Sequence, residues 1–300
     1  MKATIKYSLL FLLFSTLFVL PAIIFPFPLV QKSQSDVEPL MLFVLLLVDF
    51  IGVVYLIERI NLSGMKLFLA VVMVFWGLQT FMTQIETWYF REAMPAITDE
   101  VLLKLFLNPF ITAVTFVLAG IWILGKWKQT SGSQDHHVSL KSRWKEVLAL
   151  SVTYVFIYFL FGHYVAWQFA EVRTFYSGTP ELLGFIEQFQ HTLLIHNSIL
   201  PFQLFRGFLW ILFGLPVILY LKGNDTEKMA ACVFIYSVLP SIPLIIDNPF
   251  MPAGVRMAHL VEVSTSNGLF GLLIGLILGR HKLRSSTSDV DRLWEVEGTS

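Results

Sequence analysis

Eight long runs of mainly apolar residues constrain what this chain can fold into. An α-helix rises about 1.5 Å per residue, so about 20 residues are needed to cross a hydrocarbon core ~30 Å thick. The runs cover residues 7–25, 39–57, 66–85, 109–125, 147–170, 202–221, 229–246 and 257–279. They lack the alternation that the strands of a membrane barrel show. The sequence therefore predicts an all-α fold, a single domain built as a bundle of about eight transmembrane helices.

The composition excludes several classes of protein. Hydrophobic residues make up 56% of the chain and charged residues 14%, whereas a soluble chain carries roughly 25% charged residues. The 21 basic residues balance 21 acidic ones, so no net field attracts nucleic acid. A single cysteine, Cys232, excludes a disulfide framework and a cysteine-based metal site. We expect membrane lipids, and no nucleic acid, among the partners.

The basic residues predict the orientation in the membrane. Of the 21 Lys and Arg residues, 15 fall in every second connection or at the termini, five fall in the other connections, and Arg206 lies inside a run. The positive-inside rule then places both termini in the cytoplasm after eight crossings. We expect a basic cytoplasmic loop at 126–146, a cytoplasmic tail at 280–300 and a location in the inner (plasma) membrane of a bacterium. No small-residue cleavage site follows the first run, so we expect it to remain uncleaved.

The outer connections predict short interfacial helices. Residues 171–197 form the longest outer loop, in which Thr179 is placed to cap a helix and Pro180 to begin it. After them, apolar residues recur at helical spacing along one face, at Leu182, Ile186, Phe189 and Leu193. A second interfacial piece is expected at 99–107, ended by Asn108-Pro109. Such helices either cover a cavity or only float at the headgroup level.

Polar side chains inside the predicted spans gather in the outer half of the bilayer. They are His163, Arg206, His259 and Glu262, with Asp49, Gln79, Asn108 and Asn267. Ionisable groups at this depth need partners or water, so the sequence predicts a polar cavity that opens to the outer side. The plainer interpretation is that Arg206 pairs with Asp49 or Glu262 and that the amides bridge helices. Glu86 is expected to be a solvated loop charge.

The cluster is compatible with two kinds of chemistry. In a metal-free site, His163 or His259 is the base and Arg206 holds an anionic headgroup. In a metal site, His259 and Glu262 have a workable spacing for zinc, with His163 and His191 as further weak candidates. The sequence contains no H-E-x-x-H and no H-x-x-x-H motif, so the zinc hypothesis depends on ligands from separate segments.

The last span carries a second pattern. Gly271, Gly275 and Gly279 recur every four residues, which is typical of a face that lets another helix approach closely. The sequence leaves open whether that helix belongs to this chain or to a partner.

Three functions are compatible with these patterns. The first is a membrane enzyme that acts on a lipid or lipid-linked substrate at the outer leaflet. The second is a small-molecule transporter, although no internal repeat is visible. The third is a sensor or assembly subunit that binds a ligand or a partner helix. The glutamate pair of CAAX-type intramembrane proteases and the Gly-x-Ser-Gly of rhomboids are absent, and the sequence indicates no family.

Overall fold

The computed structural model describes residues 3–27, 38–128 and 143–279. The predicted tail at 280–300 and most of the predicted basic loop at 126–146 lie outside the described residues. Within these three ranges the regular elements are helices, together with one isolated antiparallel bridge between Ile60 and Leu221.

Eight helical segments are long and apolar enough to cross a membrane. Five are single helices: α1 (Ala3–Ile24), α2 (Pro39–Arg59), α5 (Asp99–Ile123), α9 (Ile199–Tyr220) and α11 (Ala253–Leu278). Two are composite: α3 (Gly64–Trp76) continues through the π-helix η1 (Gly77–Phe81) into α4 (Met82–Tyr89), and α10 (Asp225–Ser241) continues into the 3₁₀ turn η5 (Ile242–Ile245). α6 (Trp144–Tyr164) is followed closely by the 3₁₀ turn η4 (Ala166–Gln168). The prediction of an all-helical chain with eight segments of membrane-spanning length is confirmed.

The predicted break before the fourth span is wrong. α5 runs without interruption from Asp99 through Pro109. It begins where the side chain of Thr98 accepts a hydrogen bond from the backbone N–H of Val101, at 3.3 Å. Pro109 removes only one backbone hydrogen bond, a loss that a transmembrane helix packed against its neighbours tolerates.

The long outer connection also differs from the prediction. It holds two helices, α7 (Ala170–Ser177) and α8 (Phe185–Ile195), and Thr179 and Pro180 lie between them. α7 ends at Gly178, whose φ of +75° places it in the left-handed region that commonly terminates a helix. The chain therefore turns before it reaches Thr179, the expected cap. α8 begins after Gly184 instead.

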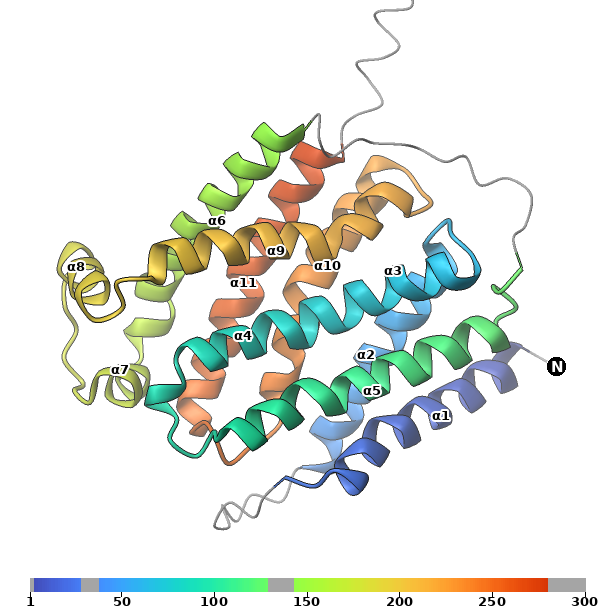
Figure 1. Ribbon diagram of the computed structural model, residues 1–300, viewed down its shortest axis with the longest axis horizontal. Helices are drawn as coiled ribbons and strands as arrows, with labels where there is room; N and C mark the ends of the chain where they lie inside the picture. Colours follow the sequence, from blue (N-terminus) through green and yellow to red (C-terminus); the bar gives the residue numbers. More distant parts are fainter. Residues whose placement is uncertain (1–2, 28–37, 129–142, 280–300) are drawn as a thin grey trace, which may run out of the picture.

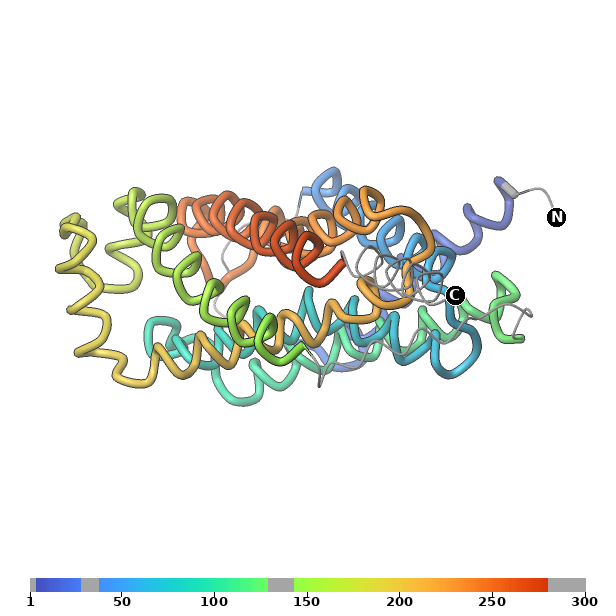
Figure 2. The backbone as a smooth tube through the Cα atoms, turned by 90° about the horizontal axis from the view of Figure 1, so that it is seen from above, coloured from blue at the N-terminus to red at the C-terminus, as the bar shows by residue number. Residues whose placement is uncertain are grey.

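Most of the long helical segments lie in two layers (Figures 1 and 2). One layer holds α9, α3–α4 and α5, and the other holds α11, α10 and α2. α6 packs against both α9 and α11, while α1 packs against α5 and α2 on the opposite side. α7 and α8 lie beyond the layers, at one end of the bundle (Figure 1).

The opposite end of the bundle is tied together by hydrogen bonds between connections. The backbone N–H of Asn61 donates to Tyr220 O at 2.7 Å, and that of Lys222 donates to Arg59 O at 2.8 Å. Arg143, at the start of α6, donates to the carbonyl of Leu278 at the end of α11. Basic residues gather here, and we call this the basic end; it includes Arg59, Lys66, Lys126, Arg143 and Lys222. The end that carries α7 and α8 is called the site end.

The glycine face of α11 packs within the chain. A Cβ atom on Gly271 would lie 2.7 Å from the carbonyl oxygen of Cys232, and one on Gly275 would lie 3.2 Å from Cα of Met229. Both contacts are with α10, so this helix takes the position that the sequence left open for Gly271 and Gly275. Cys232 is fully buried at this contact and packs as an apolar residue.

Candidate functional site

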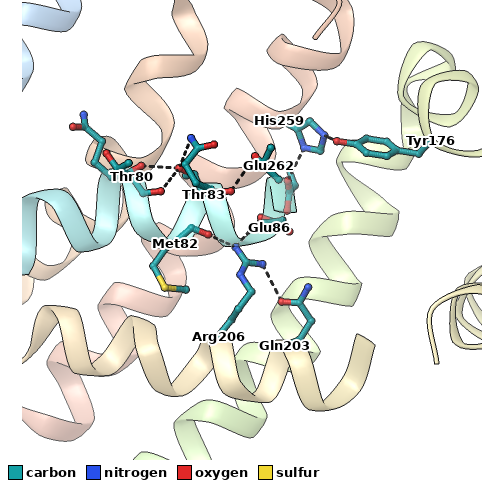
Figure 3. A network of polar contacts seen from close by, with 12 residues as sticks. Thr80, Met82, Thr83, Glu86, Tyr176, Gln203, Arg206, His259 and Glu262 are labelled. Atoms are coloured by element: carbon teal, nitrogen blue, oxygen red, sulfur yellow. Dashed lines mark hydrogen bonds and ion pairs between the residues drawn. The ribbon is translucent and has the colours of Figure 1, made fainter. Parts of the chain in front are cut away.

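Polar side chains from four elements meet at the site end of the bundle. They come from α4, α7, α9 and α11, and Figure 3 shows them pointing toward one another. The network contains Glu86, Tyr176, Gln203, Arg206, His259 and Glu262. Each lies within about three helical turns of the end of its helix, because α4 ends and α9 and α11 begin at this end. The network therefore lies at the opposite end from the basic residues.

One half of the network is a chain of three side chains centred on His259. Its Nδ1 lies 3.2 Å from Oε2 of Glu262, and its Nε2 lies 3.1 Å from the hydroxyl of Tyr176. His259 and Glu262 are three residues apart on α11, a spacing that places them on the same face. A carboxylate only accepts hydrogen bonds, so Nδ1 carries the proton and Nε2 is left as the acceptor for the tyrosine.

The other half of the network is an ion pair between Arg206 on α9 and Glu86 on α4. Nη2 of the arginine lies 2.7 Å from Oε2 of the glutamate. The side chain of Arg206 is 3% exposed and that of Glu86 is 32% exposed. This corrects two interpretations of the sequence. The ionic partner of Arg206 is neither Asp49 nor Glu262, and Glu86 is part of a helix rather than a solvated loop charge.

The guanidinium of Arg206 is held from several sides. Nη1 donates to Oε1 of Gln203 at 3.0 Å, and Nη2 also donates to the carbonyl of Met82 at 3.2 Å. The rings of Tyr154 and Phe202 lie 5.9 and 5.8 Å from the guanidinium carbon, within cation–π range. These contacts fix the cation, whereas the carboxylate of Glu86 is partly exposed and has one hydrogen bond within the part of the chain that the structure describes.

The two halves share one electrostatic environment. Glu86, Arg206 and Glu262 all lie close enough to Tyr158 of α6 to act on it electrostatically. Burial raises the pKa of the Tyr176 hydroxyl above its usual value, and the charges of Glu86 and Glu262 act in the same direction. The tyrosine therefore stays protonated at neutral pH and donates its hydroxyl hydrogen to His259.

Asp49 and Gln79 form a separate buried contact nearer the middle of the bundle. Nε2 of Gln79 donates to Oδ1 of Asp49 at 2.6 Å. Gln79 lies in the π-helix η1, a widened turn that often marks a functional or strained position. In the part of the chain that the structure describes, Oδ2 of Asp49 has no hydrogen-bond partner, and the residue is fully buried. The contact joins α2 to the α3–α4 segment.

The remaining predicted residues lie apart from the network. Asn108 donates to the carbonyl of Phe25 at 3.3 Å and so links α5 to α1. His163 is buried near the end of α6, edge-on to the stacked rings of Tyr164 and Phe185. Asn267 is buried on α11, and His191 is exposed on α8. Within the described ranges, no hydrogen bond or ion pair links these residues to the network.

The structure offers little support for zinc. Among residues 3–27, 38–128 and 143–279, no group of three histidine, cysteine, aspartate or glutamate side chains is placed to hold a metal ion. His259 and Glu262 contact each other, but His163 and His191 do not complete a ligand set with them. What the cluster offers chemically is a histidine oriented by a carboxylate, at the same end of the bundle as a fixed guanidinium.

Three residues of the network were missed from the sequence alone: Glu86, Tyr176 and Gln203. Glu86 was assigned to a loop because the third apolar run ends at residue 85, whereas the helix continues to Tyr89. Tyr176 lies outside the eight apolar runs, so its depth in the membrane gives no signal. Gln203 offered a usable signal, since it lies three residues before Arg206 and therefore on the same helix face.

Comparison of the chain with protein families, with curated proteins and with solved structures found no match. The function must therefore be inferred from the chemistry of these side chains and from their position in the bundle.

Proposed function

We propose that this chain is a membrane enzyme that acts on a lipid or lipid-linked substrate at the outer leaflet by acid–base chemistry. Both termini lie in the cytoplasm in this proposal, in the inner membrane of a bacterium. The support is the separation of charge along the bundle: basic residues gather at one end, and the polar network lies at the other. The positive-inside rule assigns the basic end to the cytoplasm, which places the network on the outer side.

The hydrogen-bonded chain from Tyr176 through His259 to Glu262 carries the proposal. Glu262 holds the imidazole with its proton on Nδ1 and stabilises the imidazolium that forms when Nε2 takes up a second proton. Nε2 already faces a hydroxyl group, at 3.1 Å. A water molecule or substrate hydroxyl that replaces the tyrosine hydroxyl would be deprotonated by His259 and attack the ester carbon or phosphorus of the headgroup. The C–O or P–O bond to the leaving alcohol then breaks, and the imidazolium of His259 returns the proton to the oxygen of that alcohol. General base catalysis of this kind contributes about 10²–10⁴-fold to a rate.

The surroundings of the site suit a substrate with a lipid tail. α8 contributes no buried residue, and its Ile186 and Leu194 side chains are 63% and 83% exposed. A short helix with exposed apolar side chains at the end of a transmembrane bundle fits the boundary between headgroups and acyl chains. A substrate held there keeps its tail in lipid while its headgroup reaches the network.

The experiment is a lipid-conversion assay with reconstituted protein. The wild type is incorporated into vesicles made from a bacterial polar lipid extract, and the lipids are followed by mass spectrometry. We expect at least one lipid to be consumed by the wild type, with a rate about 10²-fold or more lower in His259→Gln and Glu262→Gln. His191→Gln is the matched control, because this histidine is exposed on α8 and should leave the rate unchanged. Identical lipid profiles for the wild type and His259→Gln would refute the proposal.

Asp49 favours a second candidate function, a small-molecule transporter. Transporters bind ions and substrates near the bilayer midplane through polar groups inside the bundle, and Asp49 lies midway along α2 with one oxygen unpartnered among the described residues. The Asp49→Asn variant separates the two candidates. Undiminished lipid conversion by this variant supports the enzyme, whereas solute uptake that is lost in Asp49→Asn and kept in His259→Gln supports the transporter.

A further inference from the structure

The guanidinium of Arg206 has an edge that is only half used. In arginine, Nε and Nη2 point along the same edge of the planar group, and a carboxylate or phosphate can accept from both at once. Glu86 accepts from Nη2 alone. Among the residues that the structure describes, Nε of Arg206 has no hydrogen-bond partner, although the side chain is 3% exposed.

A second unpartnered donor lies on the same face of α9. Nε2 of Gln203 has no hydrogen-bond partner among the described residues, and Gln203 is fully buried. Its Oε1 is already used by Arg206, and this contact fixes which side of the amide is free to donate. Buried donors without acceptors lower stability. Among the described residues, Nε of Arg206 and Nε2 of Gln203 are two such donors.

The partners of Arg206 differ in how firmly they are held. The guanidinium is buried, it bonds to a backbone carbonyl and it lies within cation–π range of two aromatic rings. Glu86, by contrast, is partly exposed, and no other hydrogen bond of its carboxylate is present among the described residues. An incoming anion can therefore displace the carboxylate of Glu86 while the cation stays in place.

We propose that Arg206, held in place by Gln203, is a preformed subsite for a phosphate or carboxylate group, and that Glu86 occupies it when no ligand is bound. This inference deepens the proposed function. It rests on that function because it takes the ligand to be the headgroup of the substrate. An anion with two or more oxygens accepts from Nε and Nη2 together, whereas Gln203 contacts Nη1 on the opposite side of the guanidinium and keeps the group in this orientation. Neutral headgroups lack the charge needed to compete with Glu86.

The test measures anion affinity in the full-length protein purified in detergent. Two probes are titrated separately, inorganic phosphate and phosphatidylglycerol in mixed micelles, with diacylglycerol, which carries no phosphate, as the uncharged control. The apparent dissociation constant is taken from the rise in the unfolding midpoint. Glu86→Gln removes the competitor and should tighten anion binding by about tenfold or more. Gln203→Met removes the acceptor that holds Nη1 of Arg206 and should weaken anion binding by about tenfold.

Glu187→Gln is the matched control, because it removes one negative charge from the site end at an exposed position of α8. It should leave the dissociation constant within about twofold of the wild type. Stabilisation by both probes supports a subsite that reads the charged group alone, and stabilisation by phosphatidylglycerol only supports one that also needs the lipid tail. No stabilisation by either probe, or equal affinity in Glu86→Gln and the wild type, overturns the proposal.

A further variant distinguishes this inference from the proposed chemistry. His259→Gln should keep the wild-type anion affinity even though it loses lipid conversion. Anion binding without lipid conversion by the wild type would contradict the enzyme and leave the subsite standing. Lipid conversion with no effect of Glu86→Gln or Gln203→Met on anion affinity would contradict the subsite alone.

Discussion

At the residue scale, the ion pair between Arg206 and Glu86 joins two helices that are far apart in the sequence. Arg206 is buried and Glu86 is partly exposed, so the two residues contribute unequally to the free energy of unfolding. Removing Arg206 leaves Glu86 able to turn toward water, but it also removes the bonds to Gln203 and Met82. Removing the charge of Glu86 leaves a buried cation that keeps those two bonds.

A double-mutant cycle checks this account. We expect Arg206→Met to lower the free energy of unfolding by about 2–4 kcal/mol and Glu86→Gln to lower it by about 1–2 kcal/mol. The double variant should fall short of the sum by about 0.5–3 kcal/mol. The measurement is denaturant unfolding in detergent.

The matched control is the ion pair between Arg91 and Asp99, whose side chains are 46% and 90% exposed. Exposed pairs contribute about 0–1 kcal/mol, so Arg91→Met should change the free energy of unfolding by less than about 1 kcal/mol. Strict additivity of Arg206→Met and Glu86→Gln would show that the two side chains do not interact in solution.

The sequence indicated some of the site residues but not their partners. The structure places Arg206, His259 and Glu262 in one network, because all three are costly at membrane depth and must find polar contacts. The contact of Arg206 with Glu86 could not be derived, since it depends on how α4 packs beside α9. His163 lies apart for the same reason: position along a helix gives its depth but not the neighbour that it faces.

At the element scale, helix existence was predictable and helix ends were not. A run of apolar residues predicts a helix that begins at the first apolar position, whereas the helix itself begins at its N-terminal cap. α10 begins at Asp225 rather than at 229, because the side chain of Asn224 accepts a hydrogen bond from the backbone N–H of Glu227 at 2.8 Å. The break expected at Asn108-Pro109 is absent, because one proline removes a single backbone hydrogen bond and packing against neighbouring helices compensates for it.

The contact between α10 and α11 gives a prediction at this scale. Gly271→Ala places a Cβ atom 2.7 Å from the carbonyl oxygen of Cys232 and 2.8 Å from Cβ of Tyr236. The helices must move apart, and we expect the free energy of unfolding in detergent to fall by about 1–3 kcal/mol.

Gly162→Ala on α6 is the matched control for this contact. Apart from its chain neighbours and the nearby backbone of α6, no described atom lies within 4 Å of the added carbon. We expect an unchanged or slightly higher stability, by up to about 1 kcal/mol. Equal losses in the two variants would mean that the close approach of α10 and α11 is not what the glycine at 271 permits.

At the scale of the whole molecule, the two ends of the bundle differ in construction. The basic end is joined by backbone hydrogen bonds across connections that are far apart in the sequence. The site end carries short helices that lie outside the two layers (Figure 1). The charge pattern predicts which connections share an end. Each crossing of the membrane takes the chain to the other side, so basic residues are expected in every second connection.

Labelling of introduced cysteines tests the proposed orientation. Glu187→Cys places a thiol at an exposed position of α8, and Asp225→Cys places one at the exposed start of α10. A membrane-impermeant maleimide should label Glu187→Cys in intact cells and Asp225→Cys only after permeabilisation. The single native cysteine, Cys232, is fully buried and serves as the background control. Labelling with the opposite sidedness would place the network in the cytoplasm.

The position of Tyr176 has a consequence for the timing of any reaction at this site. The tyrosine belongs to an eight-residue helix in a surface connection, while His259 and Glu262 belong to a long helix of the bundle. A small displacement of α7 would therefore uncover Nε2 of the imidazole without disturbing its carboxylate partner. A ligand that displaces α7 would then, in the same step, free the nitrogen that accepts the proton.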